Sequence, residues 1–237
     1  MSLIFEERLS DSPFVERVWR SHSDEGGNFI SLALSHWQMV VWDEDGKTRL
    51  SIRGPETKPT ATVYPAHGEF VGVVFKLGTL MPHVLPGRLV NTQLDLPDAS
   101  RHSCWLHSSA WQFPTFENVD TFINRLAKQG MLIRDPVVDA ALQGQPQDLT
   151  LRTIQRRFVQ NMGMTHGAIR QIERAREATL LLKQNTPILD VVDLAGYADQ
   201  PHLTRAIKQY TGQTPAQIQH EALASQMSFL FKTETTP

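Results

Sequence analysis

The stretch that decides the C-terminal fold is ILDVVDLAGYADQPHLTRAIKQYTGQTPAQIQ, which runs from Ile188 to Gln219. Directly before it, Thr186-Pro187 predicts a helix start, with a capping hydroxyl followed by proline at the first helical position. Gly196 allows the left-handed backbone that ends a helix and begins a tight turn. We therefore expect a short helix before the turn, with an apolar face made of Ile188, Val191, Val192 and Ala195.

The residues after the turn predict a second, longer helix. Asp199 is its expected N-cap, the helix covers Gln200–Tyr210, and Gly212 ends it before Thr214-Pro215 starts another. Two helices across such a turn form a helix-turn-helix, in which the first braces the second in a DNA major groove about 12 Å wide. One side is apolar (Leu203, Ala206, Ile207, Tyr210), and the other carries Gln200, His202, Arg205 and Lys208.

A similar layout lies upstream. A short helix is expected at Arg134–Leu142, with Asp135 as its N-cap, and a second at Leu151–Asn161, with Thr150 as its cap and Gly163 at its end. The apolar side of the second helix is made of Leu151, Ile154 and Phe158, and Arg152, Gln155 and Arg156 point away from it.

One further helix is expected between the two layouts, at Thr165–Gln184. A straight helix of that length spans about 30 Å, close to the ~34 Å between successive major-groove faces on one side of DNA. A single basic helix face is usually only solvated surface. Two of them at this spacing instead predict that one chain places both recognition helices in adjacent grooves. The expected buried stripe of the joining helix is Ile169, Ile172, Ala175, Leu181 and Leu182.

From residue 131 to residue 220 the sequence resembles the AraC/XylS family of bacterial transcription regulators. LRTIQRRFVQNMG resembles the first recognition helix and its closing glycine. The sequence departs from the family pattern at Val192, Leu203, Ile207 and the pair Ile218-Gln219, and these changes keep the core positions apolar. The matching features of the second motif are Ile188, Asp190, Val191, Gly196-Tyr197, Asp199-Gln200, His202-Leu203, Arg205-Ala206, Lys208, Gly212 and Thr214-Pro215.

The resemblance implies which residues read DNA bases. Glutamine and arginine suit this task because they make bidentate contacts to adenine and guanine. Pro201 makes no polar base contact, so the second helix reads fewer bases or touches a thymine methyl. By position, the implied base-reading residues are Arg152, Gln155 and Arg156 in the upstream helix and Gln200, Pro201, His202 and Arg205 in the downstream helix.

The resemblance also implies a barrel-like effector domain and dimerisation through a helical segment. Asn118–Gln129 is the candidate interface helix, because it carries one apolar stripe. Packing of that stripe against its own domain explains it equally well. The stripe consists of Val119, Phe122, Ile123 and Leu126.

Charge is segregated along the chain. From Leu149 to Gln219 there are nine Lys and Arg residues and five acids, which gives +4 and leaves −6 for the rest of a chain whose net charge is −2. A basic region on an acidic remainder indicates nucleic acid as the partner of one part only.

The N-terminal half is expected to be β-rich. Short apolar runs alternate with turn sequences, and Asp45-Gly46 is a two-residue hairpin signal. Such spacing indicates an antiparallel barrel or sandwich. The segment Leu80–Ser109 fits short helices or irregular loops equally well. The expected strands are Phe29–Leu34, Trp37–Trp42, Thr48–Ile52, Thr60–Tyr64 and Phe70–Leu77.

No motif of catalysis or cofactor binding stands out. The sequence has no nucleophile elbow, phosphate-binding glycine loop or dinucleotide fingerprint. His102 and His107, on either side of Trp105, do not have the spacing of a metal site. Cys104 is the only cysteine, which excludes an internal disulfide and a cysteine-rich zinc site. It is interpreted as buried and inert, with a redox-sensing thiol as the less favoured alternative. We expect no enzyme activity, no cofactor and no metal.

We expect an α+β fold: a β-rich barrel or cupin-like domain at 1–115, a connecting helix at 116–130, a DNA-binding domain at 131–222 and a tail at 223–237. The expected function is sequence-specific transcription regulation, with signal sensing or self-association in the N-terminal domain. The alternatives are a small-molecule binding protein with vestigial DNA recognition and a bifunctional regulator with an N-terminal enzyme. Candidate partners are double-stranded DNA, RNA polymerase, a small-molecule effector and a second copy of the chain. The absence of a signal peptide and of an apolar run of about 20 residues favours a cytoplasmic protein with no membrane partner.

Overall fold

The computed structural model describes residues 3–44 and 46–222, so the expected tail at 223–237 lies outside the described residues. The chain divides into two compact units. Of the described residues, the first unit contains those in the ranges 3–27, 36–55 and 64–166, and the second contains those in the ranges 28–35, 56–63 and 167–222. Strands dominate the first half of the sequence and helices the second, which confirms the expected α+β fold.

The strands of the described residues belong to four sheets, of which the largest has six strands in the order β1-β2-β7-β4-β5-β9. The strands are β1 (Leu3–Leu9), β2 (Val15–Ser23), β3 (Gly27–Ser31), β4 (Gln38–Glu44), β5 (Lys47–Arg53), β6 (Thr60–Tyr64), β7 (Glu69–Phe75), β8 (Thr79–Leu80), β9 (Gln93–Asp95), β10 (Asp98–Ser100), β11 (Ser103–Leu106), β12 (Ser109–Gln112) and β13 (Ile133–Arg134).

The described α-helices follow the largest sheet in sequence. They are α1 (Val119–Lys128), α2 (Pro136–Leu142), α3 (Leu151–Met162), α4 (His166–Lys183), α5 (Ile188–Leu194), α6 (Gln200–Thr211) and α7 (Pro215–Ala222), and one 3-10 helix, η1 (Pro86–Leu89), precedes them. Within the described ranges, no helix combines the length and the apolar character that crossing a membrane needs.

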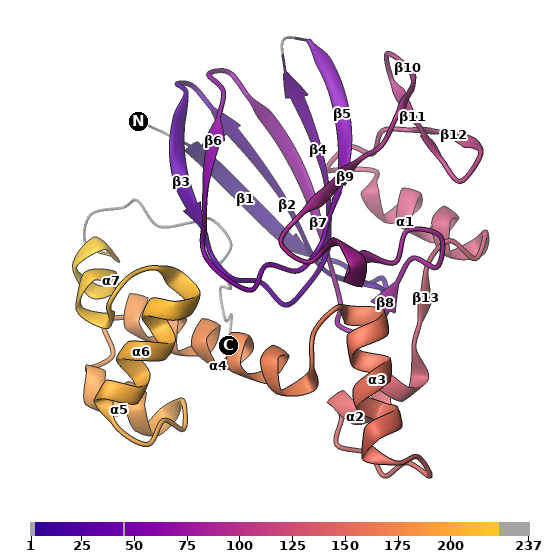
Figure 1. The fold of residues 1–237 in the computed structure, drawn as a ribbon. Coiled ribbons are helices and arrows are strands. Elements are labelled where there is room, and N and C mark those ends of the chain that lie inside the picture. The colour runs from indigo at the N-terminus through magenta and orange to yellow at the C-terminus, as the bar shows by residue number, and fades with distance from the viewer. Residues whose placement is uncertain (1–2, 45, 223–237) are drawn as a thin grey trace. The chain divides into compact units, whose positions relative to one another are not determined.

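The six-stranded sheet is antiparallel throughout and open, with β1 and β9 at its edges in the part of the chain described (Figure 1). The predicted hairpin is confirmed: Glu44 pairs with Lys47, so the loop between β4 and β5 has two residues, of which Gly46 has φ 72°. The N-terminal half is thus β-rich, as expected, but its main sheet does not close into a barrel.

One face of this sheet forms the core of the first unit. Val18, Val73 and Met39 lie side by side across β2, β7 and β4 and are at most 2% exposed. α1 covers this core with Val119, Ile123 and Leu126, all 0% exposed. The apolar stripe predicted for Asn118–Gln129 is therefore used inside its own unit, which leaves Thr121, Asn124, Arg125 and Lys128 on the exposed side of the helix.

Several elements differ from the sequence prediction. Strands β1 and β2 were not expected, because Glu and Arg residues interrupt their apolar pattern. β3 ends at Ser31, three residues before the expected end. The segment Leu80–Ser109 contains the short helix η1, which one of the two interpretations allowed, and also short strands, which neither of them included.

The second unit contains the helices from α4 onward and two segments of the N-terminal half. The helical core includes Leu182, Val191, Leu203 and Ile207, all 0% exposed. Residues 28–35 and 56–63 join this unit through hydrogen bonds, among them one from the backbone N–H of Ala33 to the carbonyl oxygen of Tyr210 at 2.9 Å. The N-terminal half of the sequence therefore supplies part of the unit that holds the second helix-turn-helix.

Candidate nucleic-acid interface

The first candidate recognition helix is α3, and its boundaries follow from the predicted caps. The hydroxyl oxygen of Thr150 accepts a hydrogen bond from the backbone N–H of Thr153 at 3.2 Å. Gly163 ends the helix with φ 69°, a left-handed conformation that favours glycine. The helix is one residue longer than predicted, because Met162 still belongs to it.

Asp135 ties α3 to the short helix α2. Its Oδ1 accepts hydrogen bonds from the backbone N–H groups of Val137 at 2.8 Å and Val138 at 3.1 Å, which confirms the predicted N-cap. Its Oδ2 accepts from the side-chain amide of Asn161 and, at 3.4 Å, from Arg157. The carboxylate is 4% exposed, and these donors offset the cost of burying its charge. Asn161 and Arg157 therefore position α3, a role that the sequence did not reveal.

The predicted base-reading side chains of α3 are exposed. Arg152, Gln155 and Arg156 lie on its solvent side, and no acid of the described residues forms an ion pair with either arginine. Phe158 is fully buried on the opposite side, as predicted. Leu151 lies seven residues before Phe158, about two turns along the same side of the helix, but it is 77% exposed. α3 thus presents an apolar side chain next to its basic ones.

The second helix-turn-helix consists of α5 and α6, with Gly196, Tyr197 and Ala198 between the cap residues. Gly196 has φ 67°, as the tight turn requires. The Oδ1 of Asp199 accepts from the backbone N–H of His202 at 2.6 Å, which confirms the predicted cap of α6. The predicted Thr186 cap of α5 is wrong, because Pro187 is the N-cap residue and no side chain caps the helix.

Tyr197 holds this turn against α4 through contacts with Arg174. Its ring is 5% exposed, and the guanidinium carbon of Arg174 lies 4.3 Å from the ring centroid. Arg174 also donates to the carbonyl oxygen of Gly196 at 3.2 Å. Burial raises the pKa of the Tyr197 phenol above its ordinary value. These contacts fix the position of the turn, and with it the start of α6.

The predicted reading residues of α6 lie on its first two turns. Gln200, Pro201 and Arg205 are exposed, and no described acid pairs with Arg205. His202 is half-buried: its ring packs edge-on against Tyr197 at 5.1 Å, and its Nδ1 accepts from the backbone N–H of Ala198 at 3.5 Å. His202 therefore contacts the turn, whereas the other three side chains point into solvent.

α4 joins α3 to α5 along the chain. It has 18 residues, and at 1.5 Å per residue its length is about 27 Å. Ile169, Ile172, Ala175 and Leu182 of the predicted stripe are buried, and Leu181 is partly buried. At its end, burial lowers the pKa of Lys183 to about 8.

A family model described as a helix-turn-helix domain matches residues 148–221, which contain both α3 and α6. These residues therefore form a helix-turn-helix domain of the AraC type. The matched residues begin just before α3 and end within α7.

A curated relative is similar to part of this chain. The HTH-type transcriptional regulator RipA of Corynebacterium glutamicum is 32% identical over 88 residues, 36% of this chain and 27% of that protein. The chain therefore spans about a quarter of the length of that relative.

Among solved structures, a single-substitution variant of apo ToxT from Vibrio cholerae has a TM-score of 0.43 and 10% identity, over 90% of this chain and 99% of that one. A second structure of ToxT from the same organism has a TM-score of 0.41 and 8% identity, over 91% of this chain and 98% of that one.

Proposed function

We propose that this protein is a sequence-specific DNA-binding regulator of transcription. The observation that carries the proposal is the AraC-type domain with two capped helices. Near its N-terminus each helix presents glutamine and arginine, and these arginines form no ion pair with any described residue. Such side chains make bidentate contacts to base edges in the major groove. Their freedom from ion pairs within the described residues leaves these guanidinium groups available for guanine or phosphate.

The reading residues assigned to α3 are Arg152, Gln155 and Arg156. Those assigned to α6 are Gln200, Pro201, His202 and Arg205. The contact of His202 with Tyr197 gives it a second role in shaping the turn. The exposed Leu151 and Pro201 suit apolar contact with a thymine methyl group. The length of α4 supports placement of the two helices in adjacent grooves of one DNA duplex.

The substitutions Arg156→Ala and Arg205→Ala test the assignment. Each should weaken binding to a selected DNA site by about 1–3 kcal/mol, because each removes a bidentate base contact. The measurement is a gel-shift titration of the full chain at fixed salt. Arg101→Ala is a matched control, since Arg101 is exposed and lies outside the AraC-type domain. Unchanged affinity of both variants would show that the reading helices are assigned wrongly.

Lysine variants at the same positions distinguish direct base contacts of these arginines from the effect of their positive charge. Arg156→Lys and Arg205→Lys keep a cation for phosphate but lose the fork that matches guanine. We expect them to retain binding to random DNA and to lose preference for the selected site. Equal preference in the wild type and both lysine variants would contradict direct reading by these arginines.

The first unit is proposed to sense a signal or to mediate self-association. Its sheet carries a cavity of about 690 Å³, within the usual size range for small-molecule sites. Self-association through α1 would have to use its polar side, because its apolar stripe is buried in its own unit. The sensing role is therefore the better supported of the two.

A further inference from the structure

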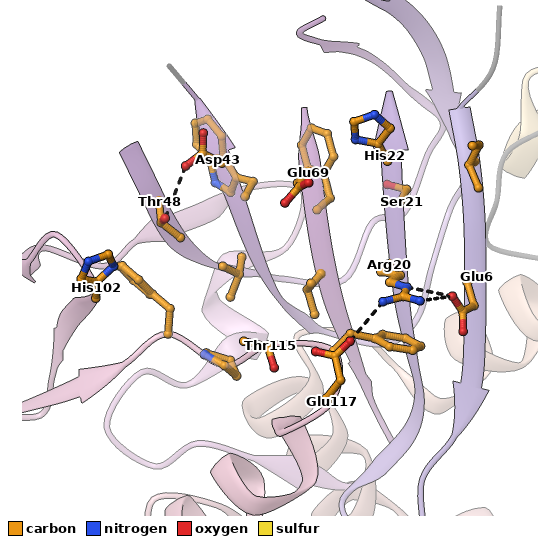
Figure 2. A pocket seen from close by; sticks show the side chains of 18 residues that line it. Glu6, Arg20, Ser21, His22, Asp43, Thr48, Glu69, His102, Thr115 and Glu117 are labelled. Carbon is orange, nitrogen blue, oxygen red and sulfur yellow. Dashed lines mark hydrogen bonds and ion pairs between the residues drawn. The ribbon is translucent and has the colours of Figure 1, made fainter. Parts of the chain in front are cut away.

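The cavity lies on one face of the six-stranded sheet, within the first unit (Figure 2). Its floor comes from strands β1, β2, β7, β4 and β5, and residues 113–117 form a wall. The cavity is half-open and measures about 690 Å³. It has the size and the mixed polar and apolar lining of a site for a small molecule.

The register of the strands shows which side chains face the cavity. Paired residues on neighbouring strands point to the same side of a sheet, and so do residues two apart on one strand. Arg20 pairs with Val71, and Val71 pairs with Val41, so these three share a face. His22, Glu69 and Asp43 lie two residues from Arg20, Val71 and Val41 on the same strands, so they lie on this face too. The face that forms the apolar core at one end of the sheet thus carries charged groups at the other.

The arginine that lines the cavity is already neutralised by cavity residues. Arg20 forms ion pairs with Glu6 at 2.6 Å and with Glu117 at 3.1 Å, and its guanidinium carbon lies 4.6 Å from the centroid of the Phe116 ring. Hydrogen bonds from its own backbone N–H and from the Thr115 hydroxyl lower the pKa of Glu117, so this carboxylate stays ionised near neutral pH. An anionic ligand would have to displace one of these carboxylates from Arg20.

The other end of the cavity holds two further carboxylates. Figure 2 shows Asp43 and Glu69 at the same end of neighbouring strands, just beyond the paired residues Trp42 and Phe70. Among the described residues, Asp43 accepts hydrogen bonds from neutral groups alone, the backbone N–H of Gly46 at 3.0 Å and the Thr48 hydroxyl at 3.4 Å. Glu69 forms no ion pair with any described residue. Like charges on adjacent strands repel, so a cation between them would stabilise this end of the sheet.

The cavity as a whole is acidic. Four of its lining residues are acids (Glu6, Asp43, Glu69, Glu117) and one is an arginine, which gives a formal charge of −3 with the histidines neutral. Between the two charged ends the floor is apolar and made of Val41 and Val71. The acidic lining favours a cationic ligand, and the apolar part of the floor favours one with a hydrocarbon body.

We propose that this cavity binds a small organic cation, an amine or guanidine with an apolar body, whose charge lies between Asp43 and Glu69 and whose body covers Val41 and Val71. The inference rests on the sensing role proposed for the first unit and names the chemical class of the signal. A bound amine would replace its hydration shell with the two carboxylates and bury its body on the valines.

Calorimetric titration of the full chain without DNA tests the proposal. The probes are 2-phenylethylamine, agmatine and spermidine, and the comparison compounds are the neutral 2-phenylethanol and the anionic 3-phenylpropionate. We expect at least one amine to bind more tightly than both comparison compounds by about tenfold or more. Glu69→Gln should weaken the binding of that amine about fivefold. Glu25→Gln is the matched control, since Glu25 is an exposed acid outside the cavity, and it should leave the affinity unchanged.

Three results would overturn the proposal. The first is that none of the amines binds with a dissociation constant below about 1 mM. The second is equal affinity for the charged, neutral and anionic phenyl compounds. The third is Glu69-dependent binding of Ca²⁺ or Mg²⁺ with no amine bound, which would assign the two carboxylates to a metal ion.

A gel-shift titration of a selected DNA site, with and without the amine, separates this inference from the proposed function. Specific DNA binding without amine binding would contradict the proposed cation site but not the proposed role in transcription regulation. Amine binding without any specific DNA binding would contradict the proposed role in transcription regulation but not the proposed cation site.

Discussion

Cys104 lies in β11 and is 1% exposed, as the sequence analysis favoured. Burial raises the pKa of its thiol to about 11, so almost none of it is thiolate at neutral pH. We expect the native thiol to react with iodoacetamide or peroxide at least about tenfold more slowly than the same thiol in urea. Mass spectrometry of timed samples measures the modification. Equal rates in the folded and unfolded protein would restore a redox-sensing role.

Lys183, at the end of α4, makes stability depend on pH. Burial lowers its pKa from 10.5 to about 8 in the folded protein. Between those two values the unfolded chain binds more protons, so the free energy of unfolding should rise as the pH increases from 8 to 10.5. The measurement is urea unfolding of the wild type and of Lys183→Met at several pH values in this window. This rise in the free energy of unfolding should appear in the wild type and not in Lys183→Met. Parallel pH profiles of the two proteins would contradict a lowered pKa of Lys183.

At the scale of elements, two helix-closing glycines differ in what surrounds them. Gly196 and Gly163 have nearly the same φ, 67° and 69°. A Cβ on Gly196 would meet nothing within 4 Å, whereas one on Gly163 would lie 2.1 Å from the carbonyl oxygen of Gly87. Gly196→Ala should therefore cost about 1 kcal/mol of stability, from the left-handed backbone alone. Gly163→Ala should cost at least about 2 kcal/mol more, because the backbone of η1 has to move.

Urea unfolding followed by circular dichroism compares the two variants. Equal losses of stability would show that α3 does not pack closely on η1. The same contact explains why Gly163 is needed for more than the end of its helix: it lets the last turn of α3 lie directly against Gly87.

Helices were the elements that sequence patterns predicted best. Asp135, Thr150 and Asp199 cap the helices assigned to them, because a cap hydrogen bond joins residues only two or three apart. The Thr186 cap failed by one residue, since Pro187 took the cap position and α5 begins at Ile188. Contacts at long range were invisible: the hydrogen bond from Asn161 to Asp135 joins residues 26 apart.

At the scale of the whole molecule, the two recognition helices predict a particular footprint. If both enter the major groove, protection from chemical cleavage should appear in two stretches about 10 base pairs apart on one side of the duplex. Affinity should fall steeply with salt, with a slope of log K against log salt of about −0.9 for each phosphate contacted. A single protected stretch would contradict the adjacent-groove arrangement, and a flat salt dependence would favour vestigial DNA recognition.

The sequence by itself determined the helices of the second half of this protein and most of their caps and turns, because helix signals act within about four residues. Only the tertiary structure decided the rest. β1 and β2 are stabilised by pairing across strands, which local patterns do not encode. The cavity exists because five strands, spread from residue 3 to residue 75, bring Glu6, Arg20, Asp43 and Glu69 onto one face in register. Residues 28–35 and 56–63 belong with the second helix-turn-helix for the same reason: the contacts that place them there join residues far apart in the chain.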